Sequence, residues 1–127
     1  MKKLLTLAFS MLFASAVMAA EYPDISIAEL NKAIAEKKVT VIDVNGSASY
    51  KKGHVPTAID FASNQDNLAS QLPKDKDALI VAYCGGPSCN AYTKSANKAK
   101  ELGYTNVKHL SAGISGWKKE GQPVEKE

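Results

Sequence analysis

The sequence contains no arginine, and all 16 of its basic residues are lysine. Guanidinium is the group that grips an oxyanion with two parallel hydrogen bonds. Bidentate binding of sulfate-like or phosphate groups is therefore unavailable, and a phosphatase that needs a cysteine and an arginine on one loop is excluded. A nucleic-acid reader should carry a basic patch with suitable docking elements, and the sequence shows none.

The sequence also lacks an apolar run long enough to span a membrane. Its longest apolar stretch, residues 4–18, is shorter than the roughly 20 residues that a spanning helix needs. Two lysines precede the stretch, and the small-residue pattern Val17-Met18-Ala19 follows it, as in a cleaved secretory signal peptide. We therefore predict a signal peptide over residues 1–19, cut after Ala19 or Ala20, and one domain over residues 20–127.

Export follows from this signal peptide. The protein is expected to be periplasmic if its source is a Gram-negative bacterium and secreted otherwise, with no stable membrane anchor after cleavage. Only two cysteines are present, and in an exported protein the simplest interpretation of such a pair is one structural disulfide. Two thiols without a nearby histidine fall short of a zinc site, so we expect no metal.

Short β-branched or apolar runs alternate with helix-like segments along the rest of the chain. Strands are predicted over residues 39–44, 58–61, 78–83 and 107–110. Helices are predicted from a capping box at residues 26–29 onward, for a short turn within 46–53, and over 66–72, 91–102 and 114–120. This alternation predicts an α/β fold, with a central, mostly parallel sheet flanked by helices on both faces.

Both cysteines lie in one short loop that follows the strongest predicted strand. Ligands bind at the carboxyl ends of the strands in open α/β sheets, and Cys84 is the first residue beyond residues 78–83. Small residues let the loop curl, so that its N–H groups and the following helix could stabilise a thiolate at Cys84. We call residues 84–90 the cysteine loop.

Three segments resemble the single-domain rhodanese family of sulfurtransferases. They are VIDVNGSASYKKGHVPTAIDF, LIVAYC and AKELGYTNVKHLSAGISGWKKEGQPVE, and they occur in the family's order between Val41 and Val124. The resemblance implies that Cys84 takes a sulfane sulfur from a donor as a persulfide. A small sulfur-containing substrate or a protein thiol would then accept that sulfur, and no cofactor is needed.

The resemblance also implies roles for other residues. The sulfur would be surrounded by the rest of the cysteine loop, namely Gly85, Gly86, Pro87, Ser88, Cys89 and Asn90. Asp43 would be a structural carboxylate that holds loop backbone near the site. His54, in the GHVP turn, would be a packing and hydrogen-bonding residue rather than a general base.

Two positions depart from the family's pattern. Asn45 stands where many members have arginine, and no basic residue lies in the cysteine loop, which counts against thiosulfate as the donor. Lys94 is the lysine nearest to the loop by sequence, although a solvated helix face is the favoured interpretation of it. Cys89 is the second departure.

Three interpretations of Cys89 remain open. It is an inert packed thiol, a resolving thiol that attacks an oxidised or persulfidated Cys84, or the partner of Cys84 in a resting disulfide. The first two are favoured over a permanent bridge, because bridging needs Cα atoms within about 7 Å. Two alternative functions accompany these possibilities: a non-catalytic rhodanese-like binding module, and a thiol–disulfide redox partner that uses the Cys84/Cys89 pair.

Three tyrosines flank the predicted site, and core packing is the expectation for Tyr83, Tyr92 and Tyr104. His109, within a short predicted strand, is expected to be a hydrogen-bonded core residue.

Overall fold

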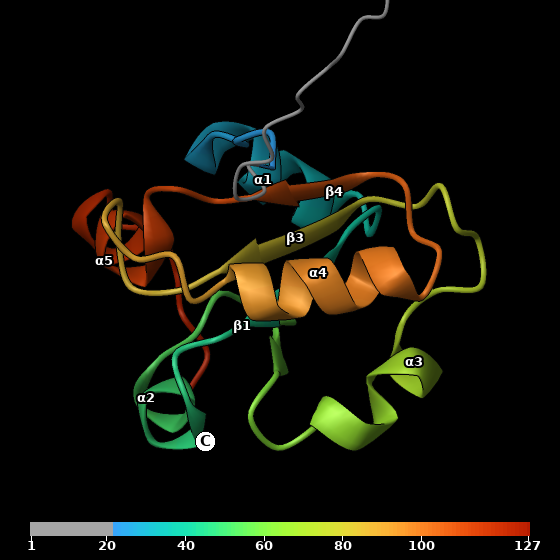
Figure 1. The fold of residues 1–127 in the computed structure, drawn as a ribbon. Helices are drawn as coiled ribbons and strands as arrows, with labels where there is room; N and C mark the ends of the chain where they lie inside the picture. The colour runs from blue at the N-terminus through green and yellow to red at the C-terminus, as the bar shows by residue number, and fades with distance from the viewer. Residues whose placement is uncertain (1–21) are drawn as a thin grey trace, which may run out of the picture.

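The computed structural model describes residues 22–127 (Figure 1). The predicted signal peptide and both of its possible cleavage points lie outside the described residues. Within residues 22–127, no helix has both the length and the apolar character needed to cross a membrane.

Four parallel strands form the central sheet. They are β1 (Thr40–Asp43), β2 (Ile59–Asp60), β3 (Ile80–Tyr83) and β4 (Val107–His109), in the order β2-β1-β3-β4. Ile80 of β3 pairs with Thr40 of β1 on one side and with Val107 of β4 on the other. The central position of β3 explains why all four of its residues are fully buried, as expected for a parallel strand covered on both faces.

Helices cover both faces of the sheet, which confirms the predicted α/β architecture (Figure 1). They are α1 (Ile27–Ala35), α2 (Ser47–Lys52), α3 (Leu68–Gln71), α4 (Thr93–Glu101) and α5 (Gly113–Lys119), and a 3₁₀ turn (Gln65–Asn67) precedes α3. Alternate residues of β3 enter two separate cores, since successive side chains of a strand point to opposite faces.

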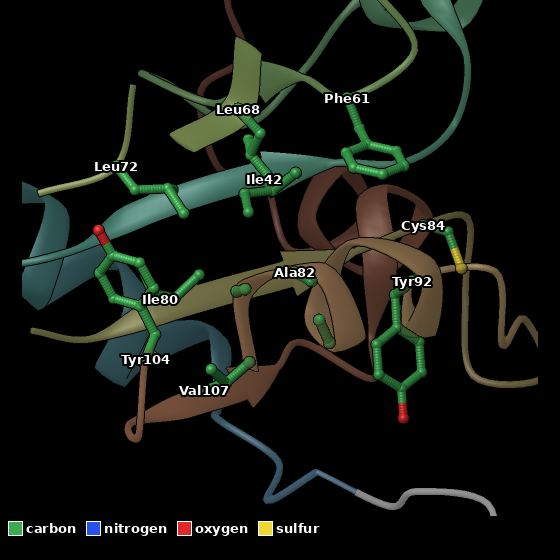
Figure 2. Packing of buried hydrophobic residues seen from close by; sticks show 12 residues of the cluster. Ile42, Phe61, Leu68, Leu72, Ile80, Ala82, Cys84, Tyr92, Tyr104 and Val107 are labelled. Carbon is green, nitrogen blue, oxygen red and sulfur yellow. The ribbon is translucent and has the colours of Figure 1, made fainter. Parts of the chain in front are cut away.

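One core lies between the sheet and helices α3 and α4 (Figure 2). Ile80 and Ala82 of β3 point into it, together with Leu68 of α3 and Ala96 of α4. The other core lies between the sheet and helices α1 and α5, where Val81 and Tyr83 meet Leu30 and the fully buried Trp117.

The predicted elements are confirmed, with shorter bounds at several ends. The segment predicted as one helix over residues 66–72 is a 3₁₀ turn followed by α3, and Leu72 is already extended. The reason is Pro73, because a proline disfavours the helical conformation at the residue before it. The predicted capping box is present: the Glu29 amide donates to Ser26 Oγ at 3.0 Å, and the Ser26 amide donates to Glu29 Oε1 at 3.2 Å.

Candidate active site

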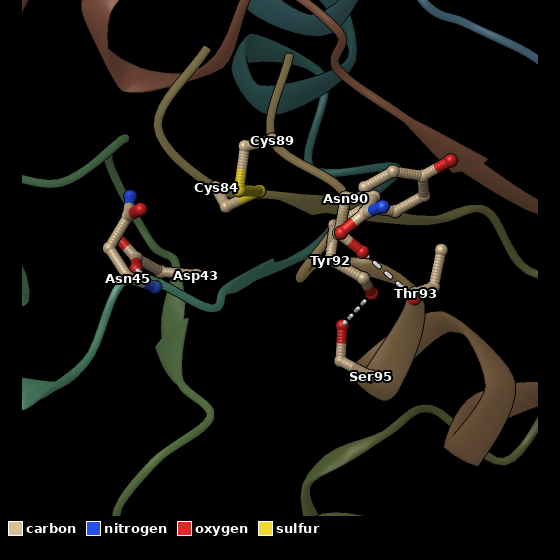
Figure 3. Close-up of a disulfide and its surroundings, with 8 residues drawn as sticks. All are labelled: Asp43, Asn45, Cys84, Cys89, Asn90, Tyr92, Thr93 and Ser95. Atoms are coloured by element: carbon tan, nitrogen blue, oxygen red, sulfur yellow. Dashed lines mark hydrogen bonds between the residues drawn. A yellow bond between two sulfur atoms is a disulfide. The ribbon is translucent and has the colours of Figure 1, made fainter. Parts of the chain in front are cut away.

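Cys84 directly follows strand β3 at the carboxyl edge of the sheet, where the cysteine loop begins. The residue is only 3% exposed and packs in the same core as Phe61 and Tyr92 (Figure 2). The loop then runs to Asn90, whose carbonyl accepts a hydrogen bond from Thr93 Oγ1 of α4 at 2.8 Å. Figure 3 shows the two cysteines between the turn at Asp43 and Asn45 and the first turn of α4.

Cys84 and Cys89 are joined by a disulfide (Figure 3). Their Cα atoms are 6.3 Å apart, which is within bridging range because the loop folds back at a turn where the Cys89 amide donates to the Gly86 carbonyl at 3.0 Å. The sequence-based preference for an unbridged Cys89 is therefore wrong for this structure. A resolving role, which would end in this same bond, stays a prediction.

Helix α5 holds the cysteine loop from one side. The amides of Ile114 and Ser115 donate to the carbonyls of Cys84 and Gly85, both at 3.0 Å. Gly113 allows this approach: its φ is +65°, and a Cβ there would lie 2.5 Å from backbone atoms of Gly85 and Gly86. The sequence did not predict this support. Its one local signal was the glycine just before the predicted helix at 114–120.

Several backbone amides of the cysteine loop have no hydrogen-bond acceptor within the described residues. Among residues 22–127, no atom accepts a hydrogen bond from the backbone N–H of Gly85, Gly86, Ser88 or Asn90. Pro87 has no N–H to donate. These four donors have no acceptor within the described residues, and their binding of a sulfur-bearing group stays a prediction.

Asp43 is completely buried at the carboxyl end of β1. Its Oδ1 accepts from the Asn45 amide at 2.7 Å, and its Oδ2 accepts from the hydroxyl of Tyr83. Burial raises the pKa of the Asp43 carboxyl above its ordinary value, and the hydrogen bonds from Tyr83 and Asn45 counteract only part of that rise. The carboxylate therefore holds the backbone at Asn45, in the turn that follows β1.

Tyr83 lies fully buried beneath the loop. Its hydroxyl accepts from the Val55 amide at 3.0 Å while it donates to Asp43. Burial, with the neighbouring Asp43 carboxylate, raises the pKa of this phenol far above its ordinary value, so the hydroxyl stays protonated as a donor. Tyr83 thus joins β3, β1 and the turn before β2.

His54 lies among structural partners. It is 2% exposed, its Nδ1 is 2.7 Å from the Tyr50 carbonyl, and its ring stacks on that of Tyr50 at 3.6 Å between centroids. Its Nε2 is 3.7 Å from Glu125 Oε1, and the two backbones exchange hydrogen bonds at 2.9 Å. Within the described residues, neither ring nitrogen contacts the cysteine loop.

The Asn45 side chain lies beside the cysteine loop, with its Oδ1 3.8 Å from where a Cβ on Gly85 would be. A pocket of about 180 Å³ next to the turn at Asn45 is lined by Val44, Gly46, Phe61, Ala62, Gln65 and Lys94, and by no residue of the cysteine loop. A neighbouring pocket of about 420 Å³ is lined by Phe61, Gln65, Asp66, Lys94, Asn97 and Lys98. The exposed Lys94 lies on a helix face as predicted and also borders both pockets.

The remaining aromatic and histidine side chains serve the fold. Tyr92 stacks on His109 at 4.2 Å between ring centroids, and His109 Nδ1 lies 3.0 Å from the Tyr22 carbonyl. The Tyr104 hydroxyl donates to the Pro73 carbonyl. Among residues 22–127, no three His, Cys, Asp or Glu side chains are close enough to hold a metal ion.

Comparison with known proteins gives the wider context of this site. The family model of the rhodanese-like domain matches residues 26–120. The crystal structure of the BH2092 protein from Bacillus halodurans superposes with a TM-score of 0.70 at 37% identity, over 83% of this chain and 77% of that one.

Two curated relatives differ in what they are named for. The thiosulfate sulfurtransferase GlpE of Shewanella oneidensis is 30% identical over 99 residues, 76% of this chain and 92% of GlpE. The HTH-type transcriptional regulator Rv0324 of Mycobacterium tuberculosis is 37% identical over 103 residues, 80% of this chain but only 44% of the regulator. The chain thus spans less than half of the regulator and nearly all of the sulfurtransferase. With the matched domain covering most of its length, this chain belongs to the rhodanese-like domain family and has sulfurtransferases among its homologues.

Proposed function

We propose that this protein is a sulfurtransferase that carries a sulfane sulfur as a persulfide on Cys84. The observation that carries the proposal is the placement of Cys84. It directly follows the central strand β3 at the carboxyl edge of a rhodanese-like sheet, and it opens a loop with four unused amides.

The reaction begins from the reduced protein, because the disulfide leaves Cys84 without a nucleophilic thiolate. The Cys84 thiolate attacks the outer sulfur of a donor X–S⁻, forming Cys84–S–S⁻ and releasing X with the electron pair of the broken X–S bond. An acceptor thiolate or cyanide then attacks the terminal sulfur and restores the Cys84 thiolate. The loop N–H groups would stabilise the negative sulfur in both steps.

The surrounding residues position this chemistry. Asp43 is committed to Tyr83 and to the Asn45 amide, so its role is to fix the turn beside the loop rather than to move a proton. With no arginine in the sequence, an anionic donor would be bound by loop amides and by Lys94, which borders the pockets beside Asn45.

Mass spectrometry tests the proposal. The reduced Cys89→Ser variant, which lacks the second thiol, should gain about 32 Da at Cys84 when incubated with a sulfane donor such as thiosulfate or an organic thiosulfonate, and cyanide should remove that mass. Cys84→Ser should gain nothing. If the reduced Cys89→Ser variant stays unmodified with every donor tried, sulfur transfer through Cys84 is refuted.

A thiol–disulfide redox partner is the second candidate function, favoured by the bond between Cys84 and Cys89. Such a protein would exchange its dithiol with a protein disulfide and would need both cysteines equally. Loading of sulfur onto Cys84 in a Cys89→Ser variant separates the two functions, since only a sulfurtransferase gives it.

Export is a further part of the proposal, supported by the signal-peptide pattern of residues 1–19. Protein recovered from the periplasm or medium of a bacterial host should begin at residue 20 or 21 by intact mass. Full-length protein found only in the cytoplasm would contradict it.

A further inference from the structure

We propose that Cys89 is a second catalytic residue, which discharges the Cys84 persulfide as hydrosulfide and leaves the disulfide that the structure contains. This inference rests on the proposed function and extends it to the product and the co-substrate. The product would be HS⁻, and each turnover would consume two electrons from an external dithiol.

The geometry of the cysteine loop supports this step. The turn closed by the Cys89 amide and the Gly86 carbonyl brings the two Cα atoms to 6.3 Å. The bond that is present joins Cys84 Sγ to Cys89 Sγ. Attack by Cys89 on the inner sulfur of a Cys84 persulfide makes this same bond, so the loop already adopts the conformation of the product.

The step balances without any further reagent. Cys84–S–S⁻ and Cys89–SH give Cys84–S–S–Cys89 and HS⁻, with the thiol proton passing to the departing sulfur. The sulfane sulfur is reduced to sulfide, and the two cysteine sulfurs are oxidised to the disulfide. Attack on the outer sulfur would instead move the persulfide to Cys89 and leave the two cysteines unbonded.

Burial favours Cys89 over an acceptor from solution. Cys84 is only 3% exposed in the disulfide form, so its own sulfur faces Cys89 and the core rather than solvent. Cys89 is five residues away on the same loop, and an intramolecular nucleophile acts at a very high effective concentration. The chain has no other cysteine that could compete.

The difference in exposure between Cys84 and Cys89 favours one direction for the return step, the reduction of the disulfide. Cys89 is only partly buried, so a reducing thiol has better access to its sulfur than to Cys84. Attack on Cys89 Sγ expels Cys84 as a thiolate, the form needed for the next sulfane donor. The second thiol of the reductant then releases Cys89, which makes a dithiol the fitting partner class.

A single-turnover experiment tests the proposal. Full-chain wild-type and Cys89→Ser proteins are reduced, freed of reductant, and mixed with thiosulfate or an organic thiosulfonate. At each time point the protein is removed by rapid filtration, the hydrosulfide in the filtrate is derivatised with monobromobimane, and the retained protein is analysed by intact mass. We expect wild type to release about one hydrosulfide per chain and to lose both free thiols. We expect Cys89→Ser to retain about 32 Da on Cys84 and to release hydrosulfide only after a thiol is added.

The outcomes separate this inference from the proposed function. If Cys89→Ser loads sulfur but wild type also keeps its persulfide with Cys89 free, Cys89 does not resolve and only this inference fails. Hydrosulfide release by Cys89→Ser at the wild-type rate has the same meaning. If Cys89→Ser gains no sulfur and wild type neither gains sulfur nor releases hydrosulfide, both proposals fail. Cys89→Ala serves as a second variant if Cys89→Ser does not fold, and the thiol count of wild type alone still decides whether the pair closes.

Discussion

Asp43 and Tyr83 form a buried hydrogen-bonded pair at the carboxyl ends of β1 and β3. A carboxylate with no exposure to water is costly unless donors surround it, and here the donors are the Tyr83 hydroxyl and the Asn45 amide. The Tyr83 hydroxyl also accepts a hydrogen bond from the Val55 amide. The Tyr83 side chain therefore links β3 to β1 and to the turn before β2, next to the cysteine loop.

Tyr83→Phe should lower the free energy of unfolding by about 1–3 kcal/mol, since it leaves a buried carboxylate and the Val55 amide short of a partner. It should also raise the pKa of Asp43 further, because the Tyr83 hydrogen bond lowers that pKa. A raised carboxyl pKa in the folded state means that stability falls as pH rises through it. The loss should therefore be larger at pH 7 than at a pH below the Asp43 pKa.

Urea denaturation at the two pH values measures this difference. Tyr104→Phe is the matched control, because the Tyr104 hydroxyl donates to a neutral acceptor, the Pro73 carbonyl. The free energy of unfolding that Tyr104→Phe loses should not depend on pH in the same way. Equal losses for Tyr83→Phe at both pH values would count against an ionised Asp43 in this pair.

At the scale of elements, the cysteine loop depends on α5 as much as on the strand that precedes it. The first two amides after Gly113 bind the carbonyls of Cys84 and Gly85, and Gly113 itself packs against the loop backbone. The first residues of the loop therefore lie between β3 and α5, and they cannot move without disturbing both elements.

Gly113→Ala should displace the loop, because its Cβ would lie 2.5 Å from Gly85 and Gly86 backbone atoms. Gly121→Ala is the matched control: its φ is also positive, at +75°, but nothing lies within 4 Å of a Cβ there. The control should lose about 1–2 kcal/mol from backbone strain alone. Gly113→Ala should lose roughly 1–3 kcal/mol more, from the added steric clash.

Sulfur loading gives the functional readout of the same pair of variants. In a Cys89→Ser background, which retains the sulfur, Gly113→Ala should load Cys84 more slowly after reduction than the background protein does, and Gly121→Ala should load it normally. Denaturant unfolding and intact mass supply the two measurements. Indistinguishable stability and loading in the two variants would show that the loop does not need the close approach of α5.

The order of elements was predictable from local pattern. The β-branched run at residues 39–44 and the apolar run at 78–83 became the two central strands, and the capping box at Ser26 begins α1 as expected. Boundaries were less predictable, since strand ends depend on pairing: β3 begins at Ile80, which pairs with both Thr40 and Val107.

At the scale of the whole molecule, the disulfide contributes little to the stability of the fold compared with the two hydrophobic cores. The two cores contain β3 and the fully buried Trp117, and most of their members lie outside the cysteine loop. The bond closes only a short loop, and short loops restrict the unfolded chain least. Reduction should therefore leave the fold intact.

Reducing the disulfide should lower the free energy of unfolding by no more than about 2 kcal/mol, from the loop-entropy relation for a closure of this length. Guanidinium denaturation with and without a reductant measures the change. Cys89→Ser should be insensitive to reductant and similar in stability to reduced wild type. Loss of folded structure on reduction would contradict the prediction and would also contradict a catalytic cycle that passes through the reduced protein.

The sequence by itself determined the α/β class, the parallel arrangement and the position of Cys84 after the central strand, because apolar periodicity and turn residues act over a few neighbouring positions. Tertiary structure alone decided which groups meet around that cysteine and which residues His54 packs against. The bond to Cys89, the support from Gly113 and Ser115, and the placement of His54 against Glu125 each depend on chain folding that brings backbone from separate elements or turns into contact. Such contacts leave no periodic trace in a single sequence, because any compatible pair of residues at the right distance could make them.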